Sequence, residues 1–221
     1  MLGQIIKIIS KYGYVYWEGL IGTLWISLVT VVLGTLVGTI IAIARMSRNR
    51  ILNKILNCYI EILRGTPILL QLYFFWIFLP KVIPFEMTDL QCVITALIVN
   101  ASSYVAEIIR AGIQAVDYGQ TEAALSLGMS RRNCMLRIIL PQAVRNILPA
   151  LGNEFISMIK QASLASVFFV AELTTSFRTI QSITFMAIPA IMIAGAIYLI
   201  LTSSLSRLVG VCETKLAVYD R

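Results

Sequence analysis

Long apolar runs separated by short polar stretches form the pattern along this chain. Five of them are close to or above the length of about 20 mostly apolar residues that a bilayer-spanning helix needs. They cover residues 20–44, 55–79, 88–109, 147–170 and 185–208. The pattern therefore predicts an all-α membrane protein with five transmembrane helices, which together form a single transmembrane domain over residues 1–221.

The segment before the first run is amphipathic rather than continuously apolar. Its lysines, Lys7 and Lys11, lie off the face on which the apolar side chains gather. That face carries Ile5, Ile9, Tyr12 and Tyr16. Such a pattern is typical of a helix lying in the membrane interface. We expect residues 1–19 to form this helix and not a cleaved signal peptide, because the apolar run that follows starts late and is too long.

The basic residues are unevenly divided between the two sides of the predicted membrane domain. Most of the 18 lysines and arginines fall on one side: Arg45, Arg48, Arg50, Lys54, Arg110, Arg131, Arg132, Arg137, Arg145, Arg207, Lys215 and Arg221. The other side has Lys7, Lys11, Lys81 and Arg178, while Arg64 and Lys160 fall inside spans. Cytoplasmic loops are enriched in Lys and Arg. We therefore expect the N-terminus outside, the C-terminus inside, and residues 117–146 in the cytoplasm.

Composition narrows the possible chemistry. The chain is 58% hydrophobic and 13% charged, with a mean hydropathy of +0.85, so it must bury apolar surface against lipid. It contains no histidine, which excludes His-based catalysis and His metal sites. The four cysteines have no metal-binding spacing. The net charge of +7 is expected to reflect membrane topology rather than nucleic-acid binding. We expect no metal and no catalytic residue.

Several polar side chains fall inside the predicted spans and share helical faces. Gly65 and Pro67 interrupt the second span, which indicates a broken helix of the kind that lines a cavity. Ser157 shares a face with two of the polar residues of span four. The candidates for a solute path are Arg64, Gln71, Asn100, Tyr104, Glu107, Glu154, Lys160, Gln161 and Ser163. Buried charges are costly in a membrane, so such residues face a protein interior or a wet cavity.

Two interpretations of these polar residues stay open. Glu61, Arg64, Glu107 and Arg110 could be structural, forming ion pairs and hydrogen bonds that hold the helices together. The polar run of span four is harder to explain as a structural link, because it places Lys, Gln and Ser side chains in mid-span. For that run a path contacting a small polar solute is the favoured interpretation.

The stretch from residue 117 to 146 is polar, basic and helix-forming. Asp117 to Gly119 predicts a turn, and Thr121 is the expected N-cap of a short helix that Gly128 ends. A second helix is expected from Ser130, with a bend at Leu140-Pro141. A capped, exposed helix between two spans suits docking into a soluble partner, although a plain solvated loop has the same composition.

The spacing within this stretch matches a known motif. Glu122-Ala123-Ala124 is followed after three residues by Gly128, after nine more by Ile138, and then by Leu140-Pro141. This resembles the EAA motif of the membrane subunits of ATP-binding-cassette importers. The segments GLIGTLWISLVTVVLG, YIEILRGTPILLQLYFF and NASSYVAEIIRAGI resemble the polar amino-acid permeases within that family, so the resemblance covers nearly the whole chain.

The resemblance implies a set of partners and a place in the cell. Two such permeases, identical or homologous, would pair in a bacterial inner or plasma membrane. Each would dock a cytoplasmic ATPase subunit, two copies in all, through Glu122, Ala123, Ala124, Gly128, Leu140 and Pro141. An extracytoplasmic solute-binding protein would deliver the amino acid. ATP and Mg would be bound by the ATPase, since this chain has no phosphate-binding loop and we expect no cofactor in it.

Other functions remain to be weighed against this one. A secondary transporter commonly shows repeated halves, of which the sequence gives no convincing sign. A channel subunit would use rings of side chains from several copies, and neither class gives the EAA stretch a role. A membrane enzyme lacks an obvious nucleophile and base. Family members usually carry an acid where this chain has Gln161, so we expect a neutral or polar amino acid as the solute.

Overall fold

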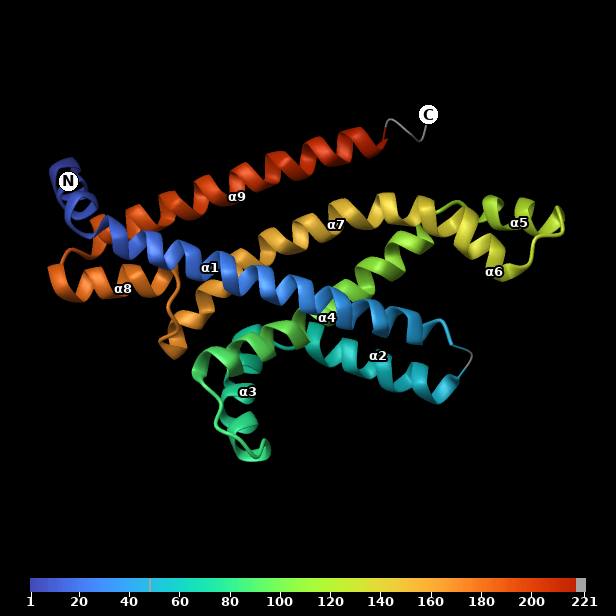
Figure 1. Cartoon of the computed structure of the whole chain (residues 1–221), viewed down its shortest axis with the longest axis horizontal. Coiled ribbons are helices and arrows are strands. Elements are labelled where there is room, and N and C mark those ends of the chain that lie inside the picture. Colours follow the sequence, from blue (N-terminus) through green and yellow to red (C-terminus); the bar gives the residue numbers. More distant parts are fainter. Residues whose placement is uncertain (48, 218–221) are drawn as a thin grey trace.

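The computed structural model describes residues 1–47 and 49–217, and their regular secondary structure is entirely helical (Figure 1). Arg48 and Arg221, two of the basic residues counted above, lie outside the described residues. The α-helices are α1 (Leu2–Arg45), α2 (Arg50–Gly65), α3 (Ile68–Val82), α4 (Asp89–Gln114), α5 (Tyr118–Ser126), α6 (Arg131–Cys134), α7 (Leu140–Gln161), α8 (Leu173–Thr184) and α9 (Ala187–Ala217). A π-helical segment, Met135–Ile139, precedes α7, and a 3₁₀ segment, Ala162–Phe168, follows it.

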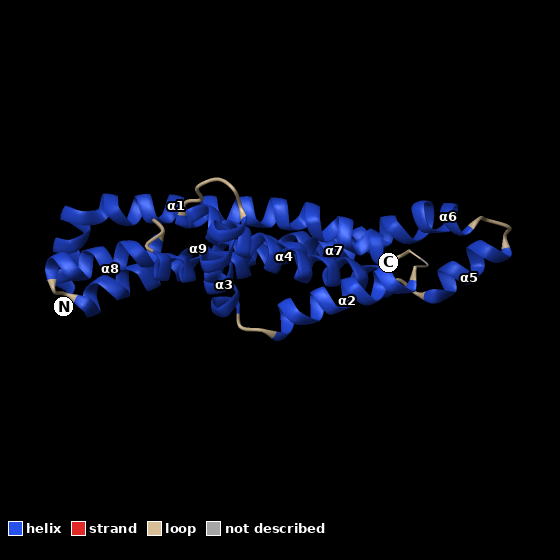
Figure 2. Cartoon of the chain, turned by 90° about the horizontal axis from the view of Figure 1, so that it is seen from below, coloured by secondary structure: helices blue, strands red, loops and turns tan. Residues whose placement is uncertain are grey.

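The prediction of an all-α membrane protein is confirmed. Among the described residues, four helical runs are long and apolar enough to cross a bilayer: α1, α4, the run from Arg131 to Phe168, and α9. The pair α2 and α3 makes a fifth span if its two bent halves are counted as one. Most of the helices lie roughly along one long axis, from which α3 turns away, with α5 and α6 at one end and α8 with the N-terminus at the other (Figures 1 and 2).

The first helix does not follow the predicted division at residue 19. α1 continues from Leu2 to Arg45, about 66 Å at 1.5 Å per residue, roughly twice the thickness of the hydrocarbon core. Ile8 and Tyr16 are buried in a cluster with residues of α8 and α9, and the Tyr16 hydroxyl donates to the carbonyl oxygen of Ala190 (2.8 Å). Residues 2–19 are therefore part of α1 and not a separate helix, and part of their apolar face packs against protein.

The most extensive helix packing joins α1 to α4. The contact face of α1 carries small residues, with Thr30, Gly34 and Gly38 four apart and all buried. A Cβ on Gly34 would lie 2.7 Å from the Ala101 side chain. Small residues at such spacing let two membrane helices approach closely. The opposite face of α1 exposes a stripe of large apolar residues, which suits lipid: Ile21, Trp25, Leu28, Val32, Leu36, Ile40 and Ile43.

The predicted break in the second span is confirmed. α2 and α3 meet at an angle of 111°, and Thr66 and Pro67 between them have extended backbone. Gly65 precedes the break, and the proline disfavours helical backbone in the residue before it. Backbone groups freed in this way need partners inside a membrane, and a buried glutamine supplies them, as described below.

One helix was not predicted from the sequence. α8, between the fourth and fifth spans, is too short for a bilayer and rich in Ser and Thr, so it gives no run of apolar residues. Glu172 caps it by accepting hydrogen bonds from the backbone N–H groups of Thr174 (2.7 Å) and Thr175 (2.6 Å). Tyr198 of α9 donates to the same carboxylate (2.9 Å). Burial raises the pKa of the Glu172 carboxyl, and these hydrogen bonds oppose that shift.

The α1–α4 contact generates a stability prediction. A Cβ added at Gly38 would lie 2.7 Å from the Val105 Cβ and 2.8 Å from the Ser102 carbonyl oxygen, too close without movement of the helices. Gly38→Ala should therefore lower the free energy of unfolding by about 1–3 kcal/mol. Thermal unfolding of the purified chain in detergent measures it. Gly195→Ala, where nothing lies within 4 Å of the added Cβ, is the matched control and should not destabilise. Equal melting temperatures for both variants would contradict this account of the contact.

Candidate translocation path and coupling segment

A buried pair of amides lies at the break between α2 and α3. The side-chain amide nitrogen of Gln71 donates to the carbonyl oxygens of Leu63 (2.7 Å) and Thr66 (3.1 Å), which the break leaves free. Asn100 of α4 donates in turn to the Gln71 side-chain oxygen (2.9 Å). These two predicted path residues are thus brought together, and their hydrogen bonds hold the broken span against α4.

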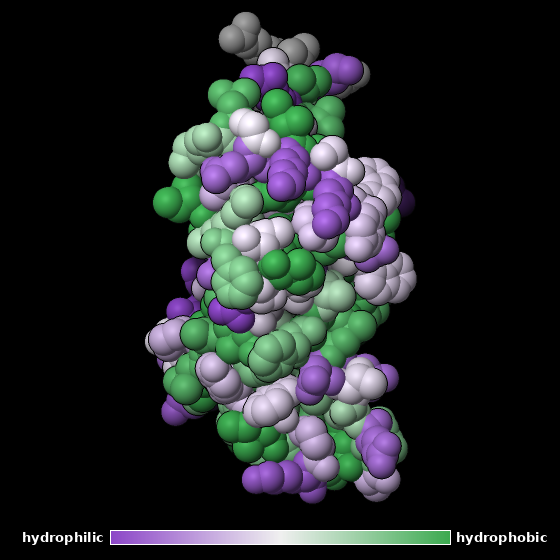
Figure 3. Space-filling model, turned by 90° about the vertical axis from the view of Figure 1, so that its left-hand side faces the viewer, coloured by the Kyte–Doolittle hydropathy of each residue, from purple (hydrophilic) through white to green (hydrophobic). Residues whose placement is uncertain are grey.

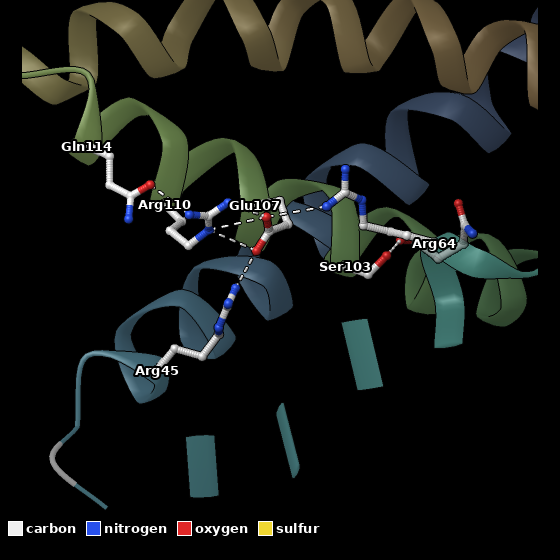
Figure 4. A network of polar contacts seen from close by, with 7 residues as sticks. Arg45, Arg64, Ser103, Glu107, Arg110 and Gln114 are labelled. Carbon is white, nitrogen blue, oxygen red and sulfur yellow. Dashed lines mark hydrogen bonds and ion pairs between the residues drawn. The ribbon is translucent and has the colours of Figure 1, made fainter. Parts of the chain in front are cut away.

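A single carboxylate connects three helix ends (Figure 4). Glu107 of α4 accepts hydrogen bonds from Arg45 at the end of α1 and from Arg110 one turn further along α4. Arg64, near the end of α2, pairs with the same carboxylate at 3.3 Å. The Arg64 guanidinium also lies 5.4 Å from the centre of the Tyr104 ring, close enough for a cation–π interaction.

This cluster, made by Arg45, Arg64, Glu107 and Arg110, is called the Glu107 cluster below. It supports the structural interpretation of these charges, because each of the three arginines binds Glu107. Arg64, Glu107 and Glu61 nevertheless also line a cavity of about 460 Å³, so the pairing does not close them off from a solute.

The polar run of the fourth span lies on α7 and its 3₁₀ extension. Gln161 donates to the Ser157 hydroxyl (3.1 Å), which confirms that these residues share a face. Ser163 donates to the Lys160 carbonyl oxygen (2.6 Å), and the Lys160 side chain is exposed. Glu154 is buried, and one of its oxygens has no hydrogen-bond partner among the described residues, as is also true of the Gln161 oxygen. This run therefore keeps two buried acceptors without a partner among the described residues.

The stretch from residue 117 to 146 begins with a hairpin of α5 and α6, which we call the coupling hairpin. α5 starts earlier than predicted. Its N-cap is Asp117, not Thr121, because the Asp117 carboxylate accepts a hydrogen bond from the Gly119 N–H (2.6 Å). Gly128 ends α5 as predicted, with a φ of 81° that favours glycine. The N–H of Gly128 bonds to Leu125 and that of Met129 to Ala124, which is a Schellman motif.

The residues of the motif do not all face outward. Ala124 is buried against Cys134 and Ile139 of the chain's own hairpin, whereas Glu122 and Ala123 are exposed. The second arm of the hairpin thus covers Ala124, and contact of the motif with a partner stays a prediction.

Two large apolar residues of the coupling hairpin were missed by sequence reasoning. Leu127 is 85% exposed and Tyr118 is 72% exposed. The sequence does show both as large apolar residues within a polar stretch. The capping pattern used to predict the helix takes no account of such residues.

The expected bend at Leu140-Pro141 takes a different form. The helical run continues from Arg131 to Phe168, and the residues before Leu140 form a π-helical turn. Pro141 stands in the first turn of α7, where its missing N–H is tolerated. Leu140 is half-buried and Pro141 is exposed. Both lie at the start of α7, within the continuous helical run.

The opposite end of the molecule carries the N-terminus and α8, and hydrophilic and hydrophobic residues alternate over its surface (Figure 3). Phe185 ends α8 and Phe169 ends the 3₁₀ segment, both with positive φ (56° and 57°). Their side chains are 90% and 87% exposed. Non-glycine residues in this backbone region are uncommon and concentrate at functional sites. The sequence alone gave no reason to select them.

Comparison with known proteins gives consistent matches. The model of the family described as "Binding-protein-dependent transport system inner membrane component" matches residues 34–217. A protein of Rickettsia typhi, provisionally named a glutamine transport system permease protein, is 34% identical over 218 residues, covering 99% of this chain and 100% of the relative. The arginine transport system permease protein ArtQ of Bacillus subtilis is 34% identical over 92% of this chain and 93% of its own length.

Solved structures agree in fold. The crystal structure of an amino acid ABC transporter with histidines contains a chain 42% identical to this one, with a TM-score of 0.90 over 94% of this chain and 96% of that one. A subunit of an inward-facing methionine ABC transporter shares the fold at 16% identity, with a TM-score of 0.70 over 90% of this chain and 96% of its own. On these matches, the chain belongs to the family of binding-protein-dependent transport system inner membrane components.

Proposed function

We propose that this chain is the permease subunit of an ATP-driven amino-acid importer, that it forms part of the solute path, and that the coupling hairpin receives the motion of a separate ATPase. The observation that carries the proposal is the 42% identity and 0.90 TM-score to a chain of an amino acid ABC transporter. A secondary transporter or a channel has no use for the coupling hairpin. ATP-dependent uptake of labelled amino acids into proteoliposomes holding this chain and its ATPase tests the proposal.

The hairpin suits its proposed role because it is both rigid and exposed. Caps at Asp117 and Gly128 fix its first helix, and Ala124 ties that helix to the second arm. Glu122, Ala123 and the exposed Leu127 then form a surface with polar and apolar parts that an ATPase groove can cover.

The partners follow from the family. A permease of this type works with two ATPase subunits, which bind ATP and Mg, and with a second permease that is identical or homologous. The family description also names a binding protein. We assign the coupling hairpin to the cytoplasm and the end with α8, Phe169 and Phe185 to the outer side, because most lysines and arginines fall in or next to the hairpin, between α1 and α2, and late in α9. The outer end would then receive the binding protein.

We assign the solute path to the polar run of α7 and the groups facing it. Its unused acceptors on Glu154 and Gln161 suit the amino group or amide of an amino acid. Gln161 carries no charge and Lys160 adds a positive one, so a neutral or polar amino acid is favoured over a cationic one. Relatives are named for glutamine, arginine and nopaline, so their names do not select one amino acid. The proposed preference therefore depends on the chain's own residues.

Coupling is tested at Gly128. Gly128→Val places a β-branched residue at a φ of 81°, at a cost of about 1–2 kcal/mol, and should distort the end of α5. ATP-driven uptake should fall about tenfold, while the amount of chain in the membrane stays the same. Gly128→Asn is the control, since Asn tolerates this backbone. Normal uptake by the Val variant would remove the hairpin from the coupling mechanism.

The orientation is tested by cysteine labelling in intact cells. In a chain without its native cysteines, Glu86→Cys, in the exposed link between α3 and α4, should react with an impermeant thiol reagent added outside. Arg132→Cys, in the coupling hairpin, should react only after the membrane is permeabilised. The reverse pattern would invert the proposed orientation.

Solute preference is tested at Gln161. Gln161→Asp introduces a carboxylate, whose charge-assisted bonds are roughly twice as strong as neutral ones. Unlabelled arginine should then compete better against labelled glutamine than it does in the unmodified transporter. Gln161→Asn keeps the side chain neutral and should not change the competition. The proposal fails if arginine is already the best substrate of the unmodified transporter.

A further inference from the structure

A second cavity lies beside the Glu107 cluster, between the end of α1, the start of α2 and the end of α4. Its volume is about 320 Å³, and its polar lining consists of Arg45, Arg110, Asn53, Asn57 and Gln114. Among the described residues no acidic side chain lines it, whereas Glu61 and Glu107 line the neighbouring cavity. We call this space the Arg45 cavity.

The charge around this cavity is unbalanced. Arg45, Arg64 and Arg110 share the single carboxylate of Glu107, which leaves two positive charges in excess within the cluster. Arg45 and Arg110 are the two that line the Arg45 cavity. A lowered dielectric strengthens the attraction of such a site for an anion.

The hydrogen-bonding capacity of Arg45 is largely unused. Its side chain is only 19% exposed, and among the described residues it donates one hydrogen bond, to Glu107. A guanidinium has five N–H donors in a planar fork that matches phosphate and carboxylate oxygens. An oxygen-rich anion in the Arg45 cavity would occupy the remaining donors.

The amides of α2 add a different requirement. Asn53 donates to the carbonyl oxygen of Ser47 (2.9 Å), but its own buried side-chain oxygen has no partner among the described residues. An oxygen of this kind accepts a hydrogen bond and cannot bind a bare anion. A ligand that carries a hydroxyl or ammonium group beside its anion satisfies both Asn53 and Arg45.

The rest of the cavity wall is apolar. Met46 of α1 and Ile109 and Ile113 of α4 line it, and the Met46 side chain is itself 53% exposed. The cavity therefore joins an apolar wall to a basic one. Basic pockets between transmembrane helices at such a boundary bind anionic lipid headgroups.

We propose that the Arg45 cavity binds the headgroup of an anionic phospholipid. The phosphate would lie between the guanidiniums of Arg45 and Arg110, a headgroup hydroxyl would donate to Asn53, and the start of the acyl chains would follow the apolar wall. This site is separate from the polar run of α7, because neither α7 nor its 3₁₀ extension contributes to the lining, but it shares Arg45 and Asn57 with the neighbouring cavity.

The position of the site gives the lipid an effect on transport. Gln114, which accepts a hydrogen bond from Arg110 (2.6 Å), is the last residue of α4, and α5 of the coupling hairpin begins at Tyr118. A lipid bound here would join the α1–α2 connection to the end of α4 from which the coupling hairpin extends. Anionic lipid should therefore raise the ATPase activity that the binding protein stimulates.

The test uses the complex of this chain with its ATPase, purified and delipidated in neutral detergent. Binding of dioctanoyl-phosphatidylglycerol and of dioctanoyl-phosphatidylcholine is measured by titration against thermal stability. We expect selective binding of the anionic lipid. Arg45→Gln should weaken it about tenfold, since a hydrogen bond to a charged group is worth about as much as a tenfold change in affinity.

Two further variants separate the site from general charge and from misfolding. Arg207→Gln removes the same charge from an exposed position of α9, outside the lining of the Arg45 cavity, and should leave binding unchanged. Asn57→Leu fills the cavity and removes no ion pair of the Glu107 cluster, because Asn57 takes no part in those pairs, and it should also weaken binding. A folded, stable Asn57→Leu complex that binds phosphatidylglycerol normally would overturn the proposal.

Competition experiments identify the source of the anion. Inorganic phosphate that displaces the lipid at equal concentration would make this a free-anion site, and glutamine that displaces it would make it part of the amino-acid path. Equal binding of the two lipids, or equal weakening by Arg45→Gln and Arg207→Gln, would show that no such site exists. Each of these four results would contradict the proposal.

Discussion

The close contact between α1 and α4 is the constraint on which the rest of this structure depends. Gly34 and Gly38 have no side chains, so the two backbones approach against Ala101, Ser102 and Val105. In lipid, where water drives no helix association, this kind of contact supplies the packing that holds two helices together. The contact also fixes the register of α1, and so places Arg45 at its end beside Glu107 of α4.

Polar groups inside the membrane region are arranged in pairs that satisfy one another. The break between α2 and α3 frees backbone carbonyls, and Gln71 binds them while accepting from Asn100. Glu107 combines three arginines from three helices. In the α7 run, Glu154 and Gln161 each keep a buried oxygen without a partner among the described residues, and so does Asn100 beside the broken span.

α4 connects these sites in order along its length. Asn100 meets the broken span, Glu107 gathers the arginines, Arg110 and Gln114 line the Arg45 cavity, and the coupling hairpin follows. A movement of the hairpin by an ATPase would therefore act first on the end of α4 and on the helices tied to Glu107. In this arrangement one helix, α4, contacts the coupling hairpin, the proposed lipid site and the broken span.

The sequence by itself determined the helical class, the break at Gly65 and Pro67, the shared face of Ser157 and Gln161, and the end of α5 at Gly128. These features depend on local properties, namely apolar length, helical spacing and the backbone freedom of glycine and proline. Only the tertiary structure decided that residues 1–19 pack against α8 and α9, that Ala124 faces its own hairpin, and that Arg45 joins Arg64 at Glu107. Those outcomes depend on which distant helix covers a given face, and the pattern of one segment holds no information about its neighbour.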